Sequence, residues 1–369
     1  ELPDYNIETP KEKAHGDYSS NIAMLLSKAQ RKPPRVIAEA IVKQLELKKS
    51  GVAACEVAGA GFINFRLEQN WLNPILSIIE EQGINYGKVN IGEGKKYMVE
   101  FVSANPTGPM HMGNARGGAL GDCLAEVLKW AGYDVTREFY LNDAGNQIEK
   151  FAKSLEARYI QLIKGEDAIE FPEDGYQGED IKEHAAAFAN INGDSYIEAS
   201  EEDRRSALVE YALEKNVEAL KRDLLRYRIS YDSWFRESSL YDSNEVLDTI
   251  NTLKNNGHAY EKEGAIWFRA TDFGEEKDEV LVRANGIPTY FAADIAYHKN
   301  KLSTRGFDKA INIWGADHYG HVARMKGALK AIGIDPERLN IIIIQLVRLM
   351  SGGEVVRMSK RTGKAVTLT

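Results

Sequence analysis

The 369-residue sequence has little of what marks a secreted, membrane-spanning or zinc-binding protein. Its two cysteines, Cys55 and Cys123, are far apart and form no C-x-x-C pair, which argues against a disulfide framework and a thiolate zinc site. The longest apolar cluster, at residues 341–347, has the length of a strand and is too short to span a membrane. The first residues are acidic and have no apolar core, so they do not form a secretory signal. We therefore expect a cytosolic protein that does not associate with membranes.

Two further absences limit how the chain could bind phosphates. No G-x-x-x-x-G-K-[ST] loop occurs anywhere, which excludes a Walker-type site. The formal net charge of −8 argues against coating by nucleic acid, although it leaves room for a local basic track. Lysine and arginine cluster at residues 28–35, 221–228 and 357–364. Each cluster alone is more typical of a solvated face than of a phosphate contact.

The pattern of apolar residues divides the chain into two parts. Residues 1–86 contain two helix-periodic segments and an alternating strand at residues 61–67, which predict a small α+β domain. A segment rich in glycine and asparagine, at residues 83–94, is a candidate linker. Residues 87–369 alternate apolar strands with helices, which predicts an α/β domain with a Rossmann-like parallel sheet.

The second part is interrupted by a segment of different character. Residues 165–203 are acidic and punctuated by glycine, and a long helix is expected at residues 202–227, so we expect a helical insertion at about residues 165–240. The parallel sheet is expected to continue on both sides of it. Its strands are expected near residues 97–102, 135–141, 265–269, 279–284, 310–314 and 339–346.

The most informative segment is the turn between the strand expected at residues 97–102 and the helix that follows it. The turn reads ANPTGPMHMGN over residues 104–114. A strand, a turn rich in proline and glycine, and a helix place unpaired backbone N–H groups at the carboxyl end of a sheet. Phosphates bind at such places because the helix dipole and the free donors both face the ligand.

Three other segments carry polar residues in an order that favours a shared site. Tyr290 and Asp294 are four residues apart and would lie on one face of a helix. The segment WGADHYGH, at residues 314–321, follows an apolar strand and precedes a helix, as the first turn does. The segment RMSKR, at residues 357–361, lies in a polar loop just after the last strand. The order and spacing of the four segments are more specific than any one of them.

Several of these residues also have a purely structural interpretation. His111 could be a turn residue bonded to the backbone, and Asp294 could pair within its own helix. His318 and His321 suggest a metal pair, but no third ligand stands at zinc spacing. We favour a ligand contact for His318 and a structural role for His321, and we expect no metal site built by the protein.

Together the four segments resemble the arginyl-tRNA synthetase branch of the class I aminoacyl-tRNA synthetases. The turn at residues 104–114 resembles the His-x-Gly-His signature with its Asn-Pro-Thr-Gly-Pro lead-in, and RMSKR resembles the Lys-Met-Ser-Lys-Ser signature. The helix with Tyr290 and Asp294 is similar to the arginine-recognition helix of the family. Residues 15–21 and 59–65 resemble its N-terminal domain, which contacts the elbow of the tRNA. The resemblance covers essentially the whole chain.

The resemblance implies ATP-dependent activation of L-arginine to arginyl-adenylate and transfer to the 3′ end of tRNA(Arg). Such a reaction needs positioning and charge stabilisation but no protein nucleophile, and Mg²⁺ would be held largely by ATP itself. The catalytic residues would be His111, Asn114 and Lys360, with His111 at the α-phosphate and Lys360 at the β- and γ-phosphates. The implied ATP-binding residues are Pro106, Gly108, His111, Gly113, Asn114, Gly315, Asp317, His318, Met358, Ser359 and Lys360.

An arginine site follows from the same resemblance and from residue chemistry. A guanidinium group needs a planar acceptor, and Asp294 beside Tyr290 supplies a carboxylate and a hydroxyl. Glu100 lies in an apolar strand and must be paired, either with a cationic substrate or with an internal arginine, which the sequence does not separate. The predicted arginine-binding residues are Glu100, Ser103, Asn105, Tyr290, Asp294 and His318.

The sequence departs from the family pattern in three places. Asn114 replaces the second histidine of the first signature, which predicts a weaker or relocated contact with the phosphates. Arg357 replaces the first lysine of the second signature and keeps its charge. The C-terminal helical anticodon-binding domain of the family is absent after Thr369. We therefore expect a monomeric fragment with impaired turnover, or a product that is incompletely ordered.

Two alternatives stay open from the sequence. One is another adenylating member of class I, such as a cysteinyl- or glutamyl-tRNA synthetase. A cysteinyl enzyme would need a zinc-ligand cluster that is absent here, and a glutamate pocket should offer cations where Tyr290 and Asp294 stand. The other is a tRNA-binding or regulatory module without catalysis. Such a module would have no need to keep four residues together, namely His111, Gly113, Asp294 and Lys360.

Overall fold

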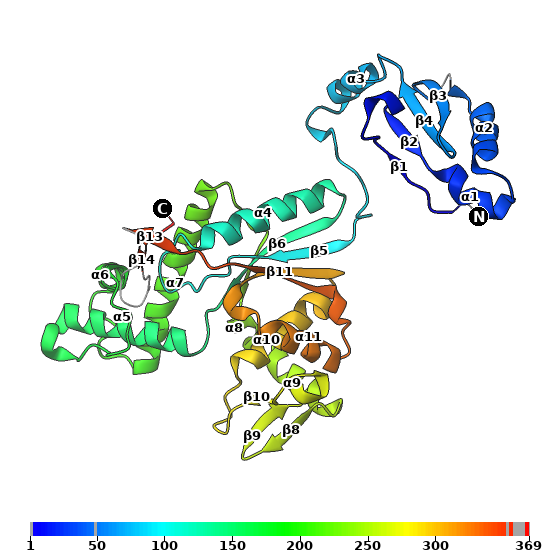
Figure 1. Cartoon of the computed structure of the whole chain (residues 1–369). Helices are drawn as coiled ribbons and strands as arrows, with labels where there is room; N and C mark the ends of the chain where they lie inside the picture. Colours follow the sequence, from blue (N-terminus) through cyan, green and yellow to red (C-terminus); the bar gives the residue numbers. More distant parts are fainter. Residues whose placement is uncertain (1–2, 48–49, 352–353, 357–365, 369) are drawn as a thin grey trace. The chain divides into compact units, whose positions relative to one another are not determined.

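The computed structural model describes residues 3–47, 50–351, 354–356 and 366–368 of the chain. Two compact units are distinguished, residues 1–87 and residues 88–369 (Figure 1). Among the described residues, no helix is long and apolar enough to cross a membrane.

The first unit is a four-stranded antiparallel sheet with helices. The strands β1 (Ile7–Glu8), β2 (Tyr18–Ser20), β3 (Val52–Ala58) and β4 (Phe62–Leu67) are ordered β1-β2-β4-β3. The helices are α1 (Ile22–Gln30), α2 (Pro34–Gln44) and α3 (Asn73–Gln82). A small core joins α1 and α2 to the sheet through Ala23, Ile37, Ala38 and Ile63. Pro34 begins α2 because the first helical position needs no N–H donor.

The second unit is built on a five-stranded parallel sheet. Its strands are β5 (Lys96–Glu100), β6 (Asp134–Leu141), β7 (Ser233–Arg236), β11 (Lys309–Gly315) and β12 (Leu339–Ile344), in the order β12-β11-β5-β6-β7. The chain runs outward from β5 to β7 and then returns to the other side of β5 with β11. The sheet order therefore reverses between β5 and β11. The α/β class with a Rossmann-like parallel sheet, expected from the sequence, is confirmed.

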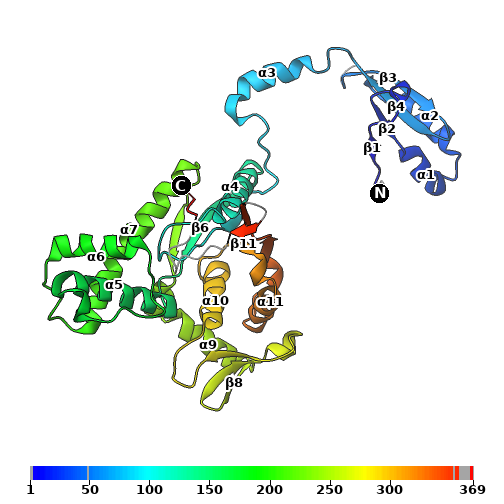
Figure 2. The ribbon, with the colours of Figure 1, turned by 60° about the vertical axis from the view of Figure 1, so that its left-hand side comes forward.

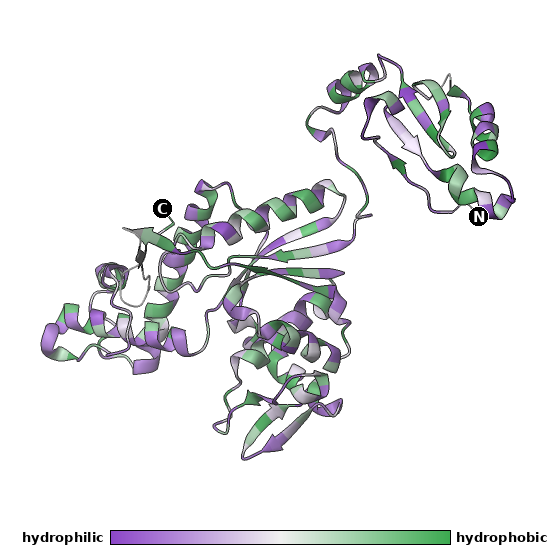
Figure 3. Ribbon diagram, viewed as in Figure 1, coloured by the Kyte–Doolittle hydropathy of each residue, from purple (hydrophilic) through white to green (hydrophobic). Residues whose placement is uncertain are grey.

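Helices cover both faces of this sheet. α4 (Asn114–Trp130) lies on one face, while α10 (Tyr290–Lys299) and α11 (His321–Ala331) lie side by side on the other (Figures 1 and 2). Alternate residues of β11 serve the two faces, because successive side chains of a strand point in opposite directions. Ile311 and Ile313 pack in the core under α4, whereas Ala310 packs in the core with α10 and α11. Figure 3 shows hydrophobic residues along β11 and β12, as expected for strands that are covered on both faces.

Between β6 and β7 the chain forms three helices with a core of their own. These are α5 (Asn146–Lys164), α6 (Glu179–Asn192) and α7 (Glu201–Arg226). Phe151, Leu155, Tyr159 and Phe188 are among the side chains buried between them. Ser200 caps α7 by accepting a hydrogen bond from the N–H of Asp203, and three acidic residues of the first turn favour the helix dipole. The long helix expected at residues 202–227 is therefore present.

Two of the expected strands do not belong to the parallel sheet. β9 (Ala265–Phe268) and β10 (Glu279–Val282) pair with β8 (Ala259–Lys262) in a separate antiparallel sheet. The expectation was wrong because these strands are short and only half-buried, which suits a sheet with one solvated face. The fifth parallel strand is β7, at residues 233–236, and the remaining elements are α8 (Ser238–Asp242), α9 (Glu245–Asn255), β13 (Leu349–Ser351) and β14 (Glu354–Val356).

Candidate active site

Most of the predicted site residues surround one cavity at the carboxyl ends of β5 and β11. This is where the strand order reverses, and ligands of open parallel sheets bind at such switch points. The cavity has a volume of about 1160 Å³. The predicted residues that line it are Glu100, Ser103, Asn105, His111, Asn114, Tyr290, Asp294, Gly315, Asp317 and His318.

The other predicted residues fall into two groups. Pro106, Gly108 and Gly113 belong to the same turn but do not line the cavity, whereas their neighbours Thr107 and His111 do. Met358, Ser359 and Lys360 lie outside the described residues. The described residues on both sides of that segment reach the site. Arg348 lines the cavity, and Thr367 forms an antiparallel bridge with His111.

Sequence reasoning missed the part of the cavity that faces the helical insertion. Asn142, Asn146, Gln147 and Lys150 line it from the end of β6 and the start of α5. The sequence does contain a signal for these residues. β6, the turn after it and α5 repeat the strand-turn-helix pattern that surrounds the turn at residues 104–114. Asn105 donates a hydrogen bond through Nδ2 to Oε1 of Gln147 over 2.6 Å, so this side of the cavity contacts the signature turn directly.

The end of β5 places Glu100 and Ser103 together. Val102 and Ser103 have φ angles of 68° and 43°, a left-handed conformation that is costly for a β-branched residue such as valine. This bend lets the Ser103 hydroxyl donate to Oε1 of Glu100 over 2.9 Å and accept from the Tyr140 N–H over 3.2 Å. Ser103 is thereby fixed at the cavity wall by β5 and β6 together.

His111 is held by the backbone of its own turn. The Gly113 N–H donates to its Nδ1 over 3.0 Å, so in the neutral ring the proton is on Nε2, which can serve as a donor. A Cβ at residue 113 would lie 2.5 Å from Cε1 of the His111 ring, so glycine leaves room for the ring in this position. The turn is also paired with the chain end, since Met112 N donates to Val366 O and Leu368 N donates to Met110 O.

Asn114 is the first residue of α4 and has an unsatisfied polar atom. Its Oδ1 is buried and has no hydrogen-bond partner within the described part of the chain. Because Asn114 also lines the cavity, a ligand donor could satisfy this oxygen. The N-terminus of α4 adds a partial positive charge beside it, which favours an anionic group.

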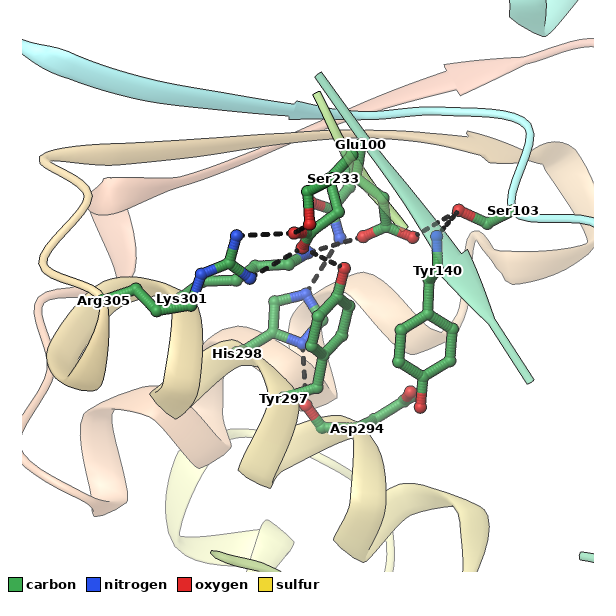
Figure 4. Close-up of polar contacts among 11 residues, drawn as sticks. Glu100, Ser103, Tyr140, Ser233, Asp294, Tyr297, His298, Lys301 and Arg305 are labelled. Atoms are coloured by element: carbon green, nitrogen blue, oxygen red, sulfur yellow. Dashed lines mark hydrogen bonds and ion pairs between the residues drawn. The ribbon is translucent and has the colours of Figure 1, made fainter. Parts of the chain in front are cut away.

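The wall of the cavity next to α10 is a chain of buried polar side chains (Figure 4). Lys301 is fully buried, and its Nζ lies 2.5 Å from Oε2 of Glu100 and 3.2 Å from Oδ1 of Asn312. Asn312 contacts Nε2 of His298 through Nδ2, and Nδ1 of His298 donates to the backbone carbonyl of Asp294 over 2.8 Å. Glu100 therefore has an internal partner, which is a lysine on the segment after α10.

The same network sets the protonation of its members. Burial, and then the charge of Lys301, hold the pKa of His298 well below its ordinary value, so this ring is neutral. Burial alone would raise the pKa of Glu138, but hydrogen bonding from Arg305 and the charge of Lys301 lower it. Glu138 also accepts from the Tyr297 hydroxyl over 2.7 Å. α10 and the segment after it are thus tied to β5, β6 and β11 by hydrogen bonds and ion pairs among largely buried side chains.

Asp294 is the acceptor that this helix presents to the cavity. Its side chain is buried, and burial raises the pKa of its carboxyl while the hydrogen bond from His321 lowers it. Tyr290 lies one turn earlier, and the negative charge of Asp294 raises the pKa of its hydroxyl. The hydroxyl therefore stays protonated and can donate. His318 lines the cavity, whereas His321 contacts Asp294. The roles expected for the two histidines stay predictions.

A second acid behind this wall was not singled out from the sequence. Glu237 is buried and accepts a hydrogen bond from the Tyr140 hydroxyl over 2.8 Å. Burial, together with the charges of Asp294 and Asp143, raises the pKa of Glu237 to about 7. With Glu100 and Asp294, the acids around this end of the cavity favour a cationic ligand.

Comparisons with known proteins agree with this site. The profile described as "tRNA synthetases class I (R), catalytic domain" matches residues 75–369, and that described as "Arginyl tRNA synthetase N terminal domain" matches residues 1–67. The arginine–tRNA ligases of Acetivibrio thermocellus and Caldanaerobacter subterraneus subsp. tengcongensis are each 60% identical to the chain over its whole length. The chain covers 66% and 65% of those proteins, about two thirds of their length.

Solved structures give the same result. A structure assigned to an arginyl-tRNA synthetase from Campylobacter jejuni has a TM-score of 0.72 and 38% identity, and the match covers 82% of this chain and 65% of that one. The Thermus thermophilus arginyl-tRNA synthetase shares the fold, with a TM-score of 0.63 and 21% identity. That match covers 99% of this chain and 64% of the other.

Proposed function

The chain belongs to the arginyl-tRNA synthetase family of class I, and from this premise we propose that it activates L-arginine with ATP and transfers it to tRNA(Arg). The observation that carries the proposal is the cavity at the switch point of the sheet. Asp294 of the acidic wall and His111 of the signature turn both line it. The acidic wall would attract a cationic amino acid, and the N-terminus of α4 beside the signature turn would attract an anionic nucleotide.

We propose that the acidic end of the cavity binds arginine. Asp294 would accept from the guanidinium group, and Tyr290 would support it from the same helix face. Ser103 and Asn105 would hold the α-amino and carboxylate groups of the amino acid. Glu100 would support Ser103 from behind, because its Oε1 accepts from the Ser103 hydroxyl while its Oε2 pairs with Lys301.

We propose that the signature turn and the loop after β12 bind ATP. His111 would donate from Nε2 to the α-phosphate, where negative charge develops as the arginine carboxylate attacks and pyrophosphate leaves. Asn114, at the N-terminus of α4, and the residues Gly315, Asp317 and His318 would complete the nucleotide site. Lys360 would contact the β- and γ-phosphates. Its segment is flanked by Arg348 and Thr367, which lie at the cavity and at His111.

We treat Mg²⁺ as part of the ATP substrate, held by the phosphates. Among the described residues there is no group of three or more His, Cys, Asp or Glu side chains that could hold a metal ion. Residues 1–86 would contact the tRNA, and the profile match over residues 1–67 supports this role. The cytosolic location and the monomeric state stay predictions.

Calorimetry with the purified chain tests the proposal. L-Arginine, L-lysine, L-glutamate and L-cysteine are titrated in turn, with and without ATP. We expect arginine to bind at least about a hundredfold more tightly than lysine, because the charged planar guanidinium fills a site with a fixed acceptor. Preferential binding of glutamate or cysteine would refute the arginyl assignment. ATP–pyrophosphate exchange with arginine, in the presence of tRNA(Arg), then reports whether bound substrates react.

A further inference from the structure

The side chain that fixes Asp294 comes from a neighbouring helix. His321 is the first residue of α11, and its Nε2 lies 2.9 Å from Oδ2 of Asp294. The two side chains are 12% and 7% exposed. An ionised carboxylate can only accept hydrogen bonds, so His321 donates its Nε2 proton. Asp294 lines the cavity and His321 does not, which places the histidine behind the acceptor.

We propose that His321 is a positioning residue for the amino-acid site, which keeps the Asp294 carboxylate ionised and oriented toward a guanidinium group. The inference deepens the proposed function and rests on it. His321 donates a hydrogen bond to Oδ2 of Asp294. This bond limits the directions in which the other oxygen, Oδ1, can accept a hydrogen bond from the substrate. A substrate whose donors are coplanar and fixed, such as arginine, gains from that restriction, whereas a rotating ammonium group gains less.

The orientation of the histidine is itself restricted by aromatic neighbours. The His321 ring lies 5.5 Å from the Trp314 ring and 5.6 Å from the Phe291 ring, measured between centroids. Trp314 belongs to β11 and Phe291 to α10, so the ring is held between the sheet and the helix that carries Asp294. A donor in this packed position loses little side-chain entropy when the ligand binds.

The charges around Asp294 explain why it needs this donor. Burial and the negative charges of Glu100 and Glu237 disfavour an ionised Asp294, whereas the hydrogen bond from His321 and the charge of Lys301 favour it. The titratable groups that face Asp294 from the surrounding elements are Glu100, Tyr140, Glu237, Tyr241, Tyr290, Lys301 and His321. Without the His321 donor, the buried acid would take up a proton at a higher pH and accept the guanidinium poorly.

The test measures binding of L-arginine and of ATP at pH 6 and pH 8 by calorimetry. H321L removes the donor, H321Q keeps an amide donor of similar reach, and D294N removes the acceptor. H258L is the matched control, because His258 also lies near an aspartate, with Nδ1 3.9 Å from Oδ2 of Asp272, and does not line the cavity. If H321L does not fold, H321N replaces it, since the shorter amide cannot reach Asp294.

We expect H321L to bind arginine at least about tenfold more weakly at pH 8, with a larger loss at pH 6 and unchanged ATP affinity. H321Q should recover most of the affinity, and H258L should bind like the wild type. Wild-type arginine binding by H321L at both pH values, or equal losses in H321Q and H321L, would overturn the inference alone. Absence of arginine binding by the wild-type chain would overturn the proposed function, and this inference would fall with it.

Discussion

The cavity has two walls that are held in place by different means. In the wall formed by α10 and residues 300–304, which we call the helix wall, buried side chains hold one another through charges and hydrogen bonds. In the wall formed by residues 104–114, which we call the turn wall, the backbone holds the side chains, as the Gly113 N–H holds His111. The helix wall therefore depends on side chains from distant segments, whereas in the turn wall His111 is held by a neighbouring backbone N–H and the turn itself pairs with the chain end.

This difference suits the two ligands that the walls would bind. A guanidinium ion needs an ionised acceptor in a place that water does not reach, so the acceptor requires compensating charges around it. Phosphates bear charge on several oxygens and are bound by backbone donors and a helix N-terminus, which need only the correct fold of a turn. Substitutions in the helix wall should therefore affect stability, pH dependence and arginine binding. Substitutions at residues 106–114 of the turn wall should affect the nucleotide alone.

The largest effect is expected from Lys301→Met in the helix wall. The substitution leaves Glu100 buried without its cation, which costs about 3–5 kcal/mol of unfolding free energy. Equilibrium unfolding in urea measures the loss. Lys330→Met on the exposed side of α11 is the matched control and should change the free energy of unfolding by less than about 0.5 kcal/mol. Equal effects of the two substitutions would show that the helix wall does not depend on its buried charges.

A pH-dependent effect is expected from Glu237. Its pKa is raised from 4.5 to about 7, so the folded state holds the proton more tightly than the unfolded state. The associated stabilisation is fully present below pH 4.5 and is lost as the pH rises through about 7. The free energy of unfolding of the wild type should therefore fall, relative to Glu237→Gln, by up to about 3 kcal/mol over this window.

The measurement is a urea unfolding series from pH 4 to pH 8. The same series on Glu202→Gln, an exposed position of α7, provides the baseline for losing a carboxyl group. A difference between wild type and Glu237→Gln that stays constant across the series would contradict the raised pKa.

Asp294→Asn should weaken arginine binding by about a hundredfold. Asparagine keeps the shape of the side chain but removes its charge. Its amide N–H group would also face the N–H groups of the guanidinium, which are donors as well. ATP affinity should not change, because the turn wall is untouched. Calorimetry with both ligands separates the two effects, and an equal loss for arginine and ATP would mean that the walls are not independent.

The smallest effect is expected from Gly113→Ala in the turn wall. The added Cβ would lie 2.5 Å from the His111 ring, so the ring must turn away from its place at the cavity. ATP should bind about tenfold more weakly while arginine binding stays the same. Gly320→Ala, at the N-cap of α11, is the control, because a Cβ there meets no atom of the described residues within 4 Å. If arginine binding also fell in Gly113→Ala, the division between the two walls would need revision.

The sequence predicted those parts of the fold that depend on a repeated pattern of apolar residues within one segment. The strands β5, β6, β11 and β12 each contain several apolar residues, and the turn at residues 104–114 follows the first of them. β9 and β10 were assigned to the wrong sheet, because a short half-buried strand carries the same pattern in either sheet. β7, at residues 233–236, was missed, since four residues give too little periodicity.

The same reasoning explains which site residues could be found. Tyr290 and Asp294 are one helical turn apart, and His111 and Asn114 share one turn of chain, so their proximity follows from local geometry. The role of Lys301 could not be found, because Glu100 lies 201 residues earlier in the chain. A lysine near the end of a helix usually indicates an exposed position, whereas here the segment after α10 turns inward.

The sequence by itself determined the family, the α/β class and the order of the four motifs, because these depend on hydrophobic periodicity and on residues that are neighbours in the chain. Only the tertiary structure decided that Lys301 pairs with Glu100, that His321 holds Asp294, and that α5 contributes to the cavity. Such pairings arise where the order of strands in the sheet brings distant segments together. A buried charge is stable only beside its partner, and the partner is chosen by the fold as a whole.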